Sequence, residues 1–328
     1  MPANRLLYGD NLAILSDLRN DPLVNGRVAL VYVDPPFATD QEFRFGQAHV
    51  SRPKGGKVAY SDRLTGKAYL DALRERLLLL RDLLSPGGSI YVHIDAKMQH
   101  RVRLLMDDVF GERRFVSQVI RVKCNPKNFD RAAFGNVWDT LLFYRKEGGD
   151  PIWNGSRQDY TREQLRRLFP RVDKKGRRYT TVPVHAPGET ADGPTGGAWR
   201  GRPPPTGRHW RSPPEELDLL DREGLIEWSK RGNPRRILYA DEQRKKQTKR
   251  QDLWTFKDPV RPKYPTEKNL RMLEVIVQAS SRPGDIILDA YCGSGTTLVA
   301  AERLDRRWIG IDSSKTAIAV AKERLGLT

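Results

Sequence analysis

The feature that most constrains the fold is an unbroken apolar run, Val28 to Val33, which ends abruptly at Asp34-Pro35-Pro36. An apolar run without polar alternation is typical of a strand buried on both faces of a parallel sheet. The two prolines end the strand, because proline offers no N–H to a neighbouring strand. The sequence therefore predicts a buried strand whose carboxyl end carries Asp34.

Segments with helical and strand patterns alternate on both sides of this run. Between residues 68 and 84, leucines recur at a spacing that places them on one helix face, and Pro86-Gly87-Gly88 follows as a break. This alternation predicts an α/β fold with a doubly wound, mostly parallel sheet. Further strands are expected at 89–95, 138–146, 285–289 and 308–312, and further helices at 96–110, 267–281, 296–304 and 313–325.

The stretch from about residue 150 to 255 has a different composition. Its apolar runs are short, and arginine, proline and glycine become frequent, as in Arg200-Gly201-Arg202-Pro203. Three tryptophans, Trp199, Trp210 and Trp228, are interleaved with the basic residues. We interpret the stretch as an inserted region with a separate task, and a set of solvated loops is the alternative.

The net charge narrows the kind of partner. The chain has 58 Lys and Arg residues against 41 Asp and Glu residues, which gives a formal net charge of +17. A small soluble domain usually carries about 2–8 net charges. The excess positive charge therefore favours a polyanionic partner such as nucleic acid over the alternative that the charge only keeps the protein soluble.

Cysteine usage and hydropathy indicate the compartment. The two cysteines, Cys124 and Cys292, lie far apart and form neither a disulfide framework nor a zinc-binding pattern. The first ten residues contain no apolar signal core, and no stretch reaches the length of a membrane span. A soluble, intracellular protein is expected.

A glycine-rich turn follows the predicted strand 285–289. Gly293-Ser294-Gly295 stands before a predicted helix, where glycines let a ligand approach the backbone and the helix N-terminus favours anionic groups. The next strand ends in Asp312, 17 residues after Gly295, and an acidic residue at about that spacing can hold ribose hydroxyls. A phosphate loop is excluded because no Gly-Lys-Ser/Thr follows, and a nicotinamide site lacks its third glycine. A close structural turn is the remaining alternative.

Asp34-Pro35-Pro36-Phe37 lies where open α/β sheets bind their ligands, at the carboxyl end of a buried strand. The Asp34 carboxylate and the Pro35 carbonyl can converge as hydrogen-bond acceptors, and Phe37 offers an aromatic face. Two acceptors and one aromatic ring suit a planar base that carries an amino group. Such a base would have to be flipped out of a duplex. A purely structural strand-to-turn transition is the alternative.

Taken in order, these motifs resemble the amino-group DNA methyltransferases of bacterial restriction-modification systems, in their circularly permuted β class. In that class the catalytic motif precedes the cofactor motif, and here Asp34 precedes Asp289 by 255 positions. The resemblance covers about two thirds of the chain and implies a Rossmann-like methyltransferase fold that uses S-adenosylmethionine, circularly permuted and with an inserted target-recognition region. The implied division is 1–149 for the catalytic half, 150–258 for the basic target-recognition region and 259–328 for the cofactor-binding half.

The resemblance also assigns roles to individual positions. By resemblance Asp10 contacts the adenine of the cofactor, Thr266 and Lys268 lie near its methionine carboxylate, and Asp312 binds its ribose. The catalytic motif is Asp34, Pro35, Pro36 and Phe37, in which Phe37 keeps the stacking face of the commoner tyrosine without its hydroxyl. The implied cofactor-binding residues are Asp10, Asn11, Thr266, Lys268, Asp289, Ala290, Tyr291, Cys292, Gly293, Ser294, Gly295, Thr296, Thr297 and Asp312.

Some positions depart from the family pattern or have simpler explanations. Asn269 stands where many members have proline, and Ala290-Tyr291 replaces the commoner Pro-Phe. Asp10 could cap a helix at 11–19, and Asp95 is interpreted as structural because no motif supports it. The five histidines show no metal-ligand spacing. The sequence therefore predicts no metal site and no covalent intermediate.

The resemblance implies direct transfer of a methyl group to an exocyclic base nitrogen, with adenine N6 preferred because Asp-Pro-Pro-aromatic motifs usually accompany adenine. Cytosine N4 stays open, and an RNA or protein methyltransferase or an inactive DNA-binding relative is less favoured. Double-stranded DNA is the expected partner, a homodimer and a cognate restriction endonuclease are left open, and no membrane is expected. The expected location is the bacterial cytoplasm, at the nucleoid. Candidates for contact with the DNA backbone are Arg200, Arg202, Arg208, Arg211, Arg235, Arg236, Lys245 and Lys246.

Overall fold

The computed structural model describes residues 3–36, 41–44, 58–62, 66–126, 132–190, 193–242, 248–260, 262, 264–265 and 267–327. The chain divides into two compact units, of which the first is formed by Met1–Ser156 together with Gln251–Thr328. The second unit, Arg157–Arg250, lies within the region whose composition differs from the rest of the chain. We call them the large unit and the small unit.

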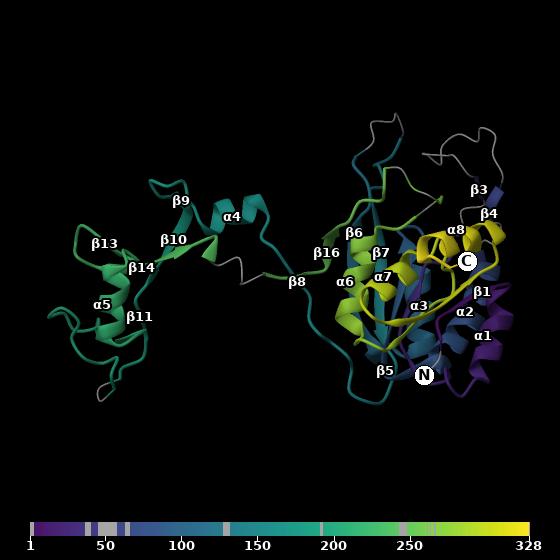
Figure 1. The fold of residues 1–328 in the computed structure, drawn as a ribbon, viewed down its shortest axis with the longest axis horizontal. Coiled ribbons are helices and arrows are strands. Elements are labelled where there is room, and N and C mark those ends of the chain that lie inside the picture. The colour runs from purple at the N-terminus through teal and green to yellow at the C-terminus, as the bar shows by residue number, and fades with distance from the viewer. Residues whose placement is uncertain are drawn as a thin grey trace. The chain divides into compact units, whose positions relative to one another are not determined.

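An eight-stranded sheet forms the centre of the large unit (Figure 1). Its strands lie in the order β1-β18-β17-β2-β5-β7-β6-β16. Neighbouring strands are parallel except where β7 pairs with β5 and β6. The predicted doubly wound, mostly parallel sheet is confirmed. Its strands are β1 (Arg5–Tyr8), β2 (Val28–Val33), β5 (Leu84–Asp95), β6 (Phe115–Val122), β7 (Trp138–Arg145), β16 (Leu253–Thr255), β17 (Ile286–Asp289) and β18 (Arg307–Asp312).

Helices cover both faces of this sheet. Val31 and Val33 face one apolar cluster with the leucines of α2, whereas Leu30 and Tyr32 face a second cluster with α6 and α7. This two-sided burial explains why the strand Val28–Val33 shows no polar alternation. The helices of the large unit are α1 (Asn11–Arg19), α2 (Gly66–Leu83), α3 (Gln99–Phe110), α6 (Leu270–Ser280), α7 (Thr296–Arg303) and α8 (Lys315–Leu325), with a 3-10 turn η1 (Glu112–Arg114). A hairpin of β3 (Gln41–Arg44) and β4 (Val58–Asp62) completes it.

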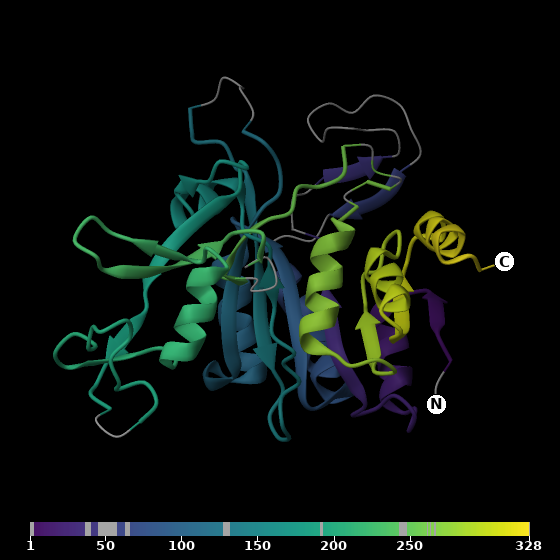
Figure 2. The same ribbon diagram turned by 60° about the vertical axis from the view of Figure 1, so that its left-hand side comes forward.

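Strand β17, from the C-terminal part of the chain, pairs with β2 from the N-terminal part. The register places Asp289 opposite Tyr32, two residues before Asp34. Figure 2 shows the yellow-green helix α6 beside the blue and purple strands from the first half of the chain. Because β1, β18, β17, β2 and β5 are parallel, their carboxyl ends share one edge, and the residues that follow them converge there.

The small unit is built around a four-stranded sheet in the order β13-β14-β10-β9. Trp199 and Trp210 are buried in its core beside α5, and their indole N–H groups donate to the Asp218 carboxylate and the Gly197 carbonyl. The interleaved tryptophans therefore stabilise this unit from inside. Its elements are β8 (Arg157–Gln158), α4 (Arg162–Leu168), β9 (Arg171–Val172), β10 (Arg178–Pro183), β11 (His185–Pro187), β12 (Arg208–Trp210), α5 (Pro214–Arg222), β13 (Ile226–Trp228), β14 (Pro234–Tyr239) and β15 (Thr248–Lys249).

Two details differ from the sequence-based expectations. The strand expected from residue 89 begins at Leu84, so Pro86-Gly87-Gly88 lies inside β5 rather than ahead of it, where the pairing with β2 is irregular. Asn269, at a position where many members of the resembled class have proline, is the N-cap of α6: its side chain accepts from Met272 N–H. Within the described residues, no helix has both the length and the apolar character needed to cross a membrane.

Candidate active site

The candidate site lies at the edge of the large sheet where β2 and β17 end. Asp34 directly follows β2 and is mostly buried, Pro35 is buried, and Pro36 is half-buried. The Lys268 ammonium, in the segment just before α6, lies 3.0 Å from Asp34 Oδ2. Thus two residues far apart in sequence meet at the predicted catalytic turn, while Phe37 lies outside the described residues.

Behind Asp34 is a buried network of polar side chains that the sequence analysis does not identify. His93 Nδ1, on β5, lies 3.9 Å from Asp34 Oδ1 and 2.7 Å from the hydroxyl of Tyr32. On the other side of the ring, His93 Nε2 lies 3.1 Å from Asp139 Oδ1 on β7. The second oxygen of Asp139 accepts from Arg121 of β6 at 3.2 Å. His93, Asp139 and Arg121 are all buried.

Three of these buried side chains have pKa values shifted by their surroundings. Burial alone would raise the pKa of Asp139, but His93 and Arg121 outweigh it and hold that pKa below its usual range. Arg121 also pairs with Asp258, and these carboxylates raise its pKa against the opposing effect of burial. Burial, reinforced by Asp34, raises the pKa of Tyr32, which therefore stays a neutral phenol. The polar side chains behind Asp34 thus include a buried ion pair, Arg121 with Asp139, which lies next to the imidazole of His93.

The glycine-rich turn joins β17 to α7. Gly293 and Gly295 have positive φ angles of 51° and 76°, a conformation that glycine adopts without strain. A Cβ at Gly295 would come within 3.0 Å of Ala321 in α8, so the turn also packs closely against that helix. Arg324 of α8 donates to the carbonyl and hydroxyl of Ser294 and to the hydroxyl of Thr296. The turn is therefore held in place while the N-terminus of α7 faces the strand ends.

Asp312, after β18, is tied to the same turn. One of its carboxylate oxygens accepts from Gly293 N–H and the other from Ser314 N–H, both at 2.8 Å. Burial raises the pKa of Asp312, although these two hydrogen bonds oppose the shift. Its carboxylate is thus oriented by the backbone at the position expected for the ribose-binding acid.

The segment between β1 and α1 also reaches the end of β17. Asn11 donates through its side chain to the Ala290 carbonyl at 3.0 Å. Asp10 is the N-cap of α1, accepts from Leu12 N–H, and lies 3.1 Å from the Arg76 guanidinium. Arg76, on α2, also donates to the Asn11 side chain. The capping alternative for Asp10 is therefore correct, and the same residue remains exposed at the sheet edge.

The remaining candidates are placed as follows. Cys292 is buried, and burial raises the pKa of its thiol well above the usual value, which disfavours the reactive thiolate form. Ala290, after β17, and Thr296 and Thr297, the first residues of α7, are buried, and Tyr291 is half-buried. Thr266 lies outside the described residues. Asp95 accepts from Lys97 and Met98 N–H, consistent with its structural interpretation. Among the residues that the structure describes, no cluster of His, Cys, Asp and Glu is suited to hold a metal ion.

Asp289, at the end of β17, has a carboxyl group whose ionisation changes near neutral pH. Burial raises the pKa of Asp289 to about 7 from its ordinary value of 3.8, although the Thr297 hydroxyl and the Tyr291 N–H donate to it and oppose the rise. A carboxyl whose pKa is raised by folding stabilises the fold fully below its unfolded pKa, and this stability is lost as the pH rises through the folded pKa.

We therefore expect the wild-type melting temperature to fall relative to that of Asp289→Asn as the pH rises from about 4 to about 7, the interval between the unfolded and folded pKa of Asp289. Asparagine keeps the size and the acceptor oxygen but does not titrate. Thermal unfolding of both proteins across this range measures the difference. Equal falls in the two proteins would show that Asp289 ionises without cost in the folded state.

The basic residues that are candidates for DNA contact belong to the small unit. Some of them have partners within that unit. Arg200 forms ion pairs with Asp218 and Asp221, and Arg202 donates to the Gly232 carbonyl. Arg235 donates to Thr181 across the sheet. These three side chains thus have partners within the unit. Lys245 and Lys246 lie outside the described residues.

Arg208 and Arg211 converge on His185 of β11. Arg208 lies 3.2 Å from its Nδ1, and Arg211 donates to its carbonyl. Burial, followed by the charges of Arg208, Arg211 and Arg235, lowers the pKa of His185. This part of the small unit therefore has a concentrated positive potential.

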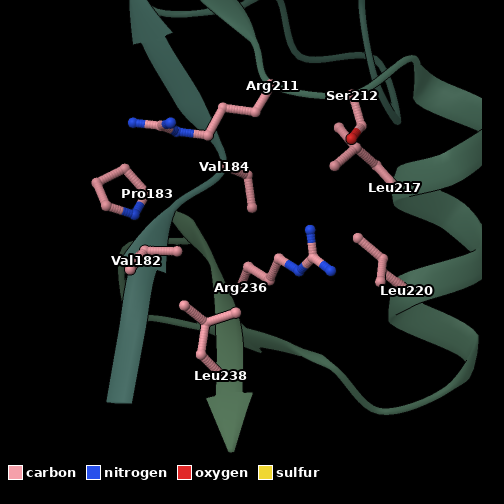
Figure 3. Close-up of a pocket in the computed structure, with 9 residues that line it drawn as sticks. All are labelled: Val182, Pro183, Val184, Arg211, Ser212, Leu217, Leu220, Arg236 and Leu238. Carbon is pink, nitrogen blue, oxygen red and sulfur yellow. The ribbon is translucent and has the colours of Figure 1, made fainter. Parts of the chain in front are cut away.

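Arg211 and Arg236 also line a pocket of about 370 Å³ in the small unit. Figure 3 shows the Arg236 side chain extending from β14 toward Leu220 of α5, with Val182 and Val184 on the opposite wall. The walls are otherwise mostly apolar, completed by Pro183, Ser212, Leu217 and Leu238. An apolar cavity bordered by two guanidinium groups suits a flat or anionic group more than a neutral polar one.

Known proteins are similar to this chain in sequence and in fold. A family model described as DNA methylase, for N6 and N4 methyltransferases, matches residues 28–323. The chain is 41% identical over 331 residues to the type II methyltransferase M.EcaI of Enterobacter cloacae, covering 99% of this chain and 70% of that protein. It is also 25% identical over 340 residues to the Mod subunit of the type III restriction-modification enzyme StyLTI of Salmonella typhimurium, covering 92% of this chain and 50% of that subunit.

Solved structures agree on the fold. The M1.HpyAVI–SAM complex superposes with a TM-score of 0.52 at 18% identity, covering 98% of this chain and 99% of that one. The cytosine-N4-specific PvuII DNA methyltransferase gives a TM-score of 0.54 at 13% identity, covering 99% of this chain and 86% of that one. At such identities the likeness establishes the shared α/β methyltransferase fold.

Proposed function

Because this chain belongs to the N6/N4 DNA methylase family, we propose that it transfers a methyl group from S-adenosylmethionine to the exocyclic amino group of a base in DNA. The observation that carries the proposal is the junction of β2 and β17. There the Asp-Pro-Pro turn headed by Asp34 follows β2, and the glycine-rich turn follows Asp289 at the end of the neighbouring parallel strand β17. Solved relatives bound to SAM include M1.HpyAVI, which supports the choice of cofactor.

The residues at the sheet edge fit such a cofactor. The turn at Gly293 and Gly295 leads into the N-terminus of α7, and a helix N-terminus suits an anionic group. Asp312 presents an oriented carboxylate for ribose hydroxyls, and Asn11 borders the same end of β17. When bound, S-adenosylmethionine supplies a methyl group on an activated sulfonium, so the protein need provide neither a nucleophile nor a metal.

The protein's own contribution is to prepare the amino group. An exocyclic amine is a poor nucleophile because its lone pair is delocalised into the ring. Hydrogen bonds from the amino group to the Asp34 carboxylate and the Pro35 carbonyl favour the tetrahedral nitrogen and stabilise the positive charge that develops on it. Phe37, by its place in the motif, provides the stacking face that holds the ring at attack distance.

We further propose adenine N6 as the target. The supporting feature is aspartate at position 34, because a full carboxylate at the head of the motif is the form that usually accompanies adenine in this class. Cytosine N4 is the second candidate, favoured by the shared fold of the cytosine-N4-specific PvuII enzyme.

One experiment tests the function and the base together. The protein is incubated with labelled S-adenosylmethionine and unmethylated DNA, and the DNA is digested to nucleosides and analysed by mass. We expect N6-methyldeoxyadenosine. Detection of N4-methyldeoxycytidine instead would identify cytosine N4 as the target. The absence of label in DNA would refute the proposed function itself.

We propose that the small unit recognises the DNA, with Arg208, Arg211 and Arg236 contacting the phosphate backbone. Within the described part of the unit, none of the three forms an ion pair with an acidic side chain, whereas Arg200 is paired with Asp218 and Asp221. Double-stranded DNA, a second copy of the chain and a cognate endonuclease are the proposed partners, the last because relatives such as the StyLTI Mod subunit belong to restriction-modification enzymes. The bacterial cytoplasm, at the nucleoid, is the proposed location.

The salt dependence of DNA binding tests this surface. Replacing Arg208, Arg211 and Arg236 by glutamine should reduce the slope of log K against log salt by about 0.9 for each phosphate that is no longer neutralised. Arg200→Gln is the matched control, and it should leave the slope nearly unchanged because its guanidinium already pairs with acidic side chains. Fluorescence anisotropy over a salt series measures both. An unchanged slope in the triple variant would place the DNA surface elsewhere.

A further inference from the structure

Lys268 contacts a residue that its sequence context does not predict. By resemblance it is expected near the methionine carboxylate of the cofactor, yet its ammonium lies 3.0 Å from Asp34 Oδ2. Both side chains are largely buried, with exposed fractions of 11% for Lys268 and 17% for Asp34. An ion pair with so little solvent around it is screened much less than a surface pair. The contact therefore constrains the Asp34 carboxylate directly.

The other oxygen of Asp34 is backed by a fixed imidazole. His93 Nδ1 lies 3.9 Å from Asp34 Oδ1, and the ring is held by the Tyr32 hydroxyl on one side and by Asp139 on the other. Asp139 is itself held by Arg121. The carboxylate of Asp34 thus lies between a cation on one side and an immobilised ring on the other.

Asp34 needs such a counterion because of its neighbours. Asp289 is close enough for the charge of Asp34 to raise its pKa, so the two carboxylates repel one another across the β2–β17 junction. Asp139 lies on the far side of His93, and the Lys268 cation acts on it as well, helping to lower its pKa. Without Lys268, a flexible carboxylate at the end of β2 would turn away from these negative groups.

An ion pair on one oxygen still leaves Asp34 able to act on the amino group. A carboxylate offers about four lone-pair sites, and a lysine occupies one of them. The remaining sites can accept an amino hydrogen, provided that the carboxylate plane is held in the right direction. A displacement of about 1 Å at a reacting geometry can cost about a hundredfold in rate.

We propose that Lys268 is a positioning residue for methyl transfer, which grips Asp34 Oδ2 and fixes the plane of the catalytic carboxylate toward the target amino group. This inference rests on the proposed function. Lys268 belongs to the segment before α6, in the half of the chain that also carries the glycine-rich turn. The ion pair therefore joins the cofactor half to the catalytic half at the residue that acts on the base.

The test separates positioning from cofactor binding. For the full-length wild type, Lys268→Met and Lys268→Arg, calorimetry gives the Kd for S-adenosylmethionine, and single-turnover assays give the methylation rate at saturating cofactor and DNA. We expect Lys268→Met to lose about a hundredfold in rate with the Kd within about twofold of wild type, and Lys268→Arg to recover a large part of the rate because it keeps the cation. Lys146→Met is the control: Lys146 is another partly buried lysine, but it donates to the Asp82 and Leu84 carbonyls.

The rate at saturating cofactor decides the outcome. A Lys268→Met rate within threefold of wild type overturns the inference, whether or not the Kd has risen, because a cofactor contact alone is compensated by saturation. An inactive wild type would instead refute the proposed function, so the two failures are distinct. Thermal unfolding supplies a readout independent of activity: Lys268→Met and Asp34→Asn should have non-additive effects on Tm if the pair exists. Additive effects would also overturn the inference.

Discussion

Replacement of Asp34 by alanine is expected to reduce methyl transfer at least a hundredfold, and about a thousandfold if the carboxylate carries most of the charge stabilisation. In the proposed mechanism, this variant loses the acceptor that favours the tetrahedral amine and stabilises the positive charge on nitrogen. It leaves the glycine-rich turn, Asp312 and Asn11 untouched, so the Kd for S-adenosylmethionine should stay within about twofold. Single-turnover methylation and calorimetry measure the two quantities separately.

Asp95 provides the matched control for Asp34. It ends the neighbouring strand β5 at the same edge of the sheet, but its carboxylate accepts from the N–H groups of Lys97 and Met98. Asp95→Ala should lower the stability of the turn before α3 by about 1 kcal/mol and leave the rate of the folded protein intact. A wild-type rate in Asp34→Ala, or an equal loss in Asp95→Ala, would contradict the proposed role of Asp34.

The architecture is predictable because its signals are local. The apolar run Val28 to Val33 and the break at Asp34-Pro35-Pro36 are typical of a central parallel strand, and Gly293-Ser294-Gly295 is typical of a turn that needs positive φ angles. Strands β6 and β16 are not predicted. Their sequences, such as Phe115–Val122 with Ser117, Gln118 and Arg121, lack the unbroken apolar pattern because they lie toward the edge of the sheet.

The arrangement of polar and charged side chains around Asp34 cannot be predicted in the same way. Its members lie on β2, β5, β6, β7 and the segment before α6, and they meet only because the antiparallel strand β7 is inserted between β5 and β6. One signal is present in the sequence: His93 and Asp139 interrupt otherwise apolar strands. A polar residue within a strand buried on both faces indicates a buried partner, although its identity depends on the strand order.

Replacement of Arg121 by methionine is expected to lower the free energy of unfolding by about 3–5 kcal/mol at neutral pH. The Arg121 side chain is fully buried, pairs with Asp139 and Asp258, and donates to the Phe256 carbonyl at 2.8 Å. Methionine has a similar length and fills much of the space, so poorer packing is a minor part of the cost. The main cost is the carboxylate of Asp139, which is left buried without its cation. Urea unfolding measures the difference.

The pH dependence identifies this cause. In the wild type the pKa of Asp139 is held below its ordinary value, so the stability that it contributes is present above about pH 4 and is lost as the pH falls through the folded pKa. In Arg121→Met the carboxylate is easier to protonate. The difference in unfolding free energy between the two proteins should therefore shrink from pH 7 toward about pH 4.

A second variant separates the buried charge from the change in packing. Arg121→Met combined with Asp139→Asn removes both the cation and the carboxylate, so it should recover a large part of the stability that Arg121→Met alone loses. If the double variant is as unstable as the single one, packing rather than charge explains the loss. Recovery of stability without recovery of the methylation rate would show in addition that Asp139, through His93, supports the geometry of Asp34. In that case the buried pair of Arg121 and Asp139 would cost stability but serve the proposed function, because together with His93 it would hold the Asp34 carboxylate in its orientation.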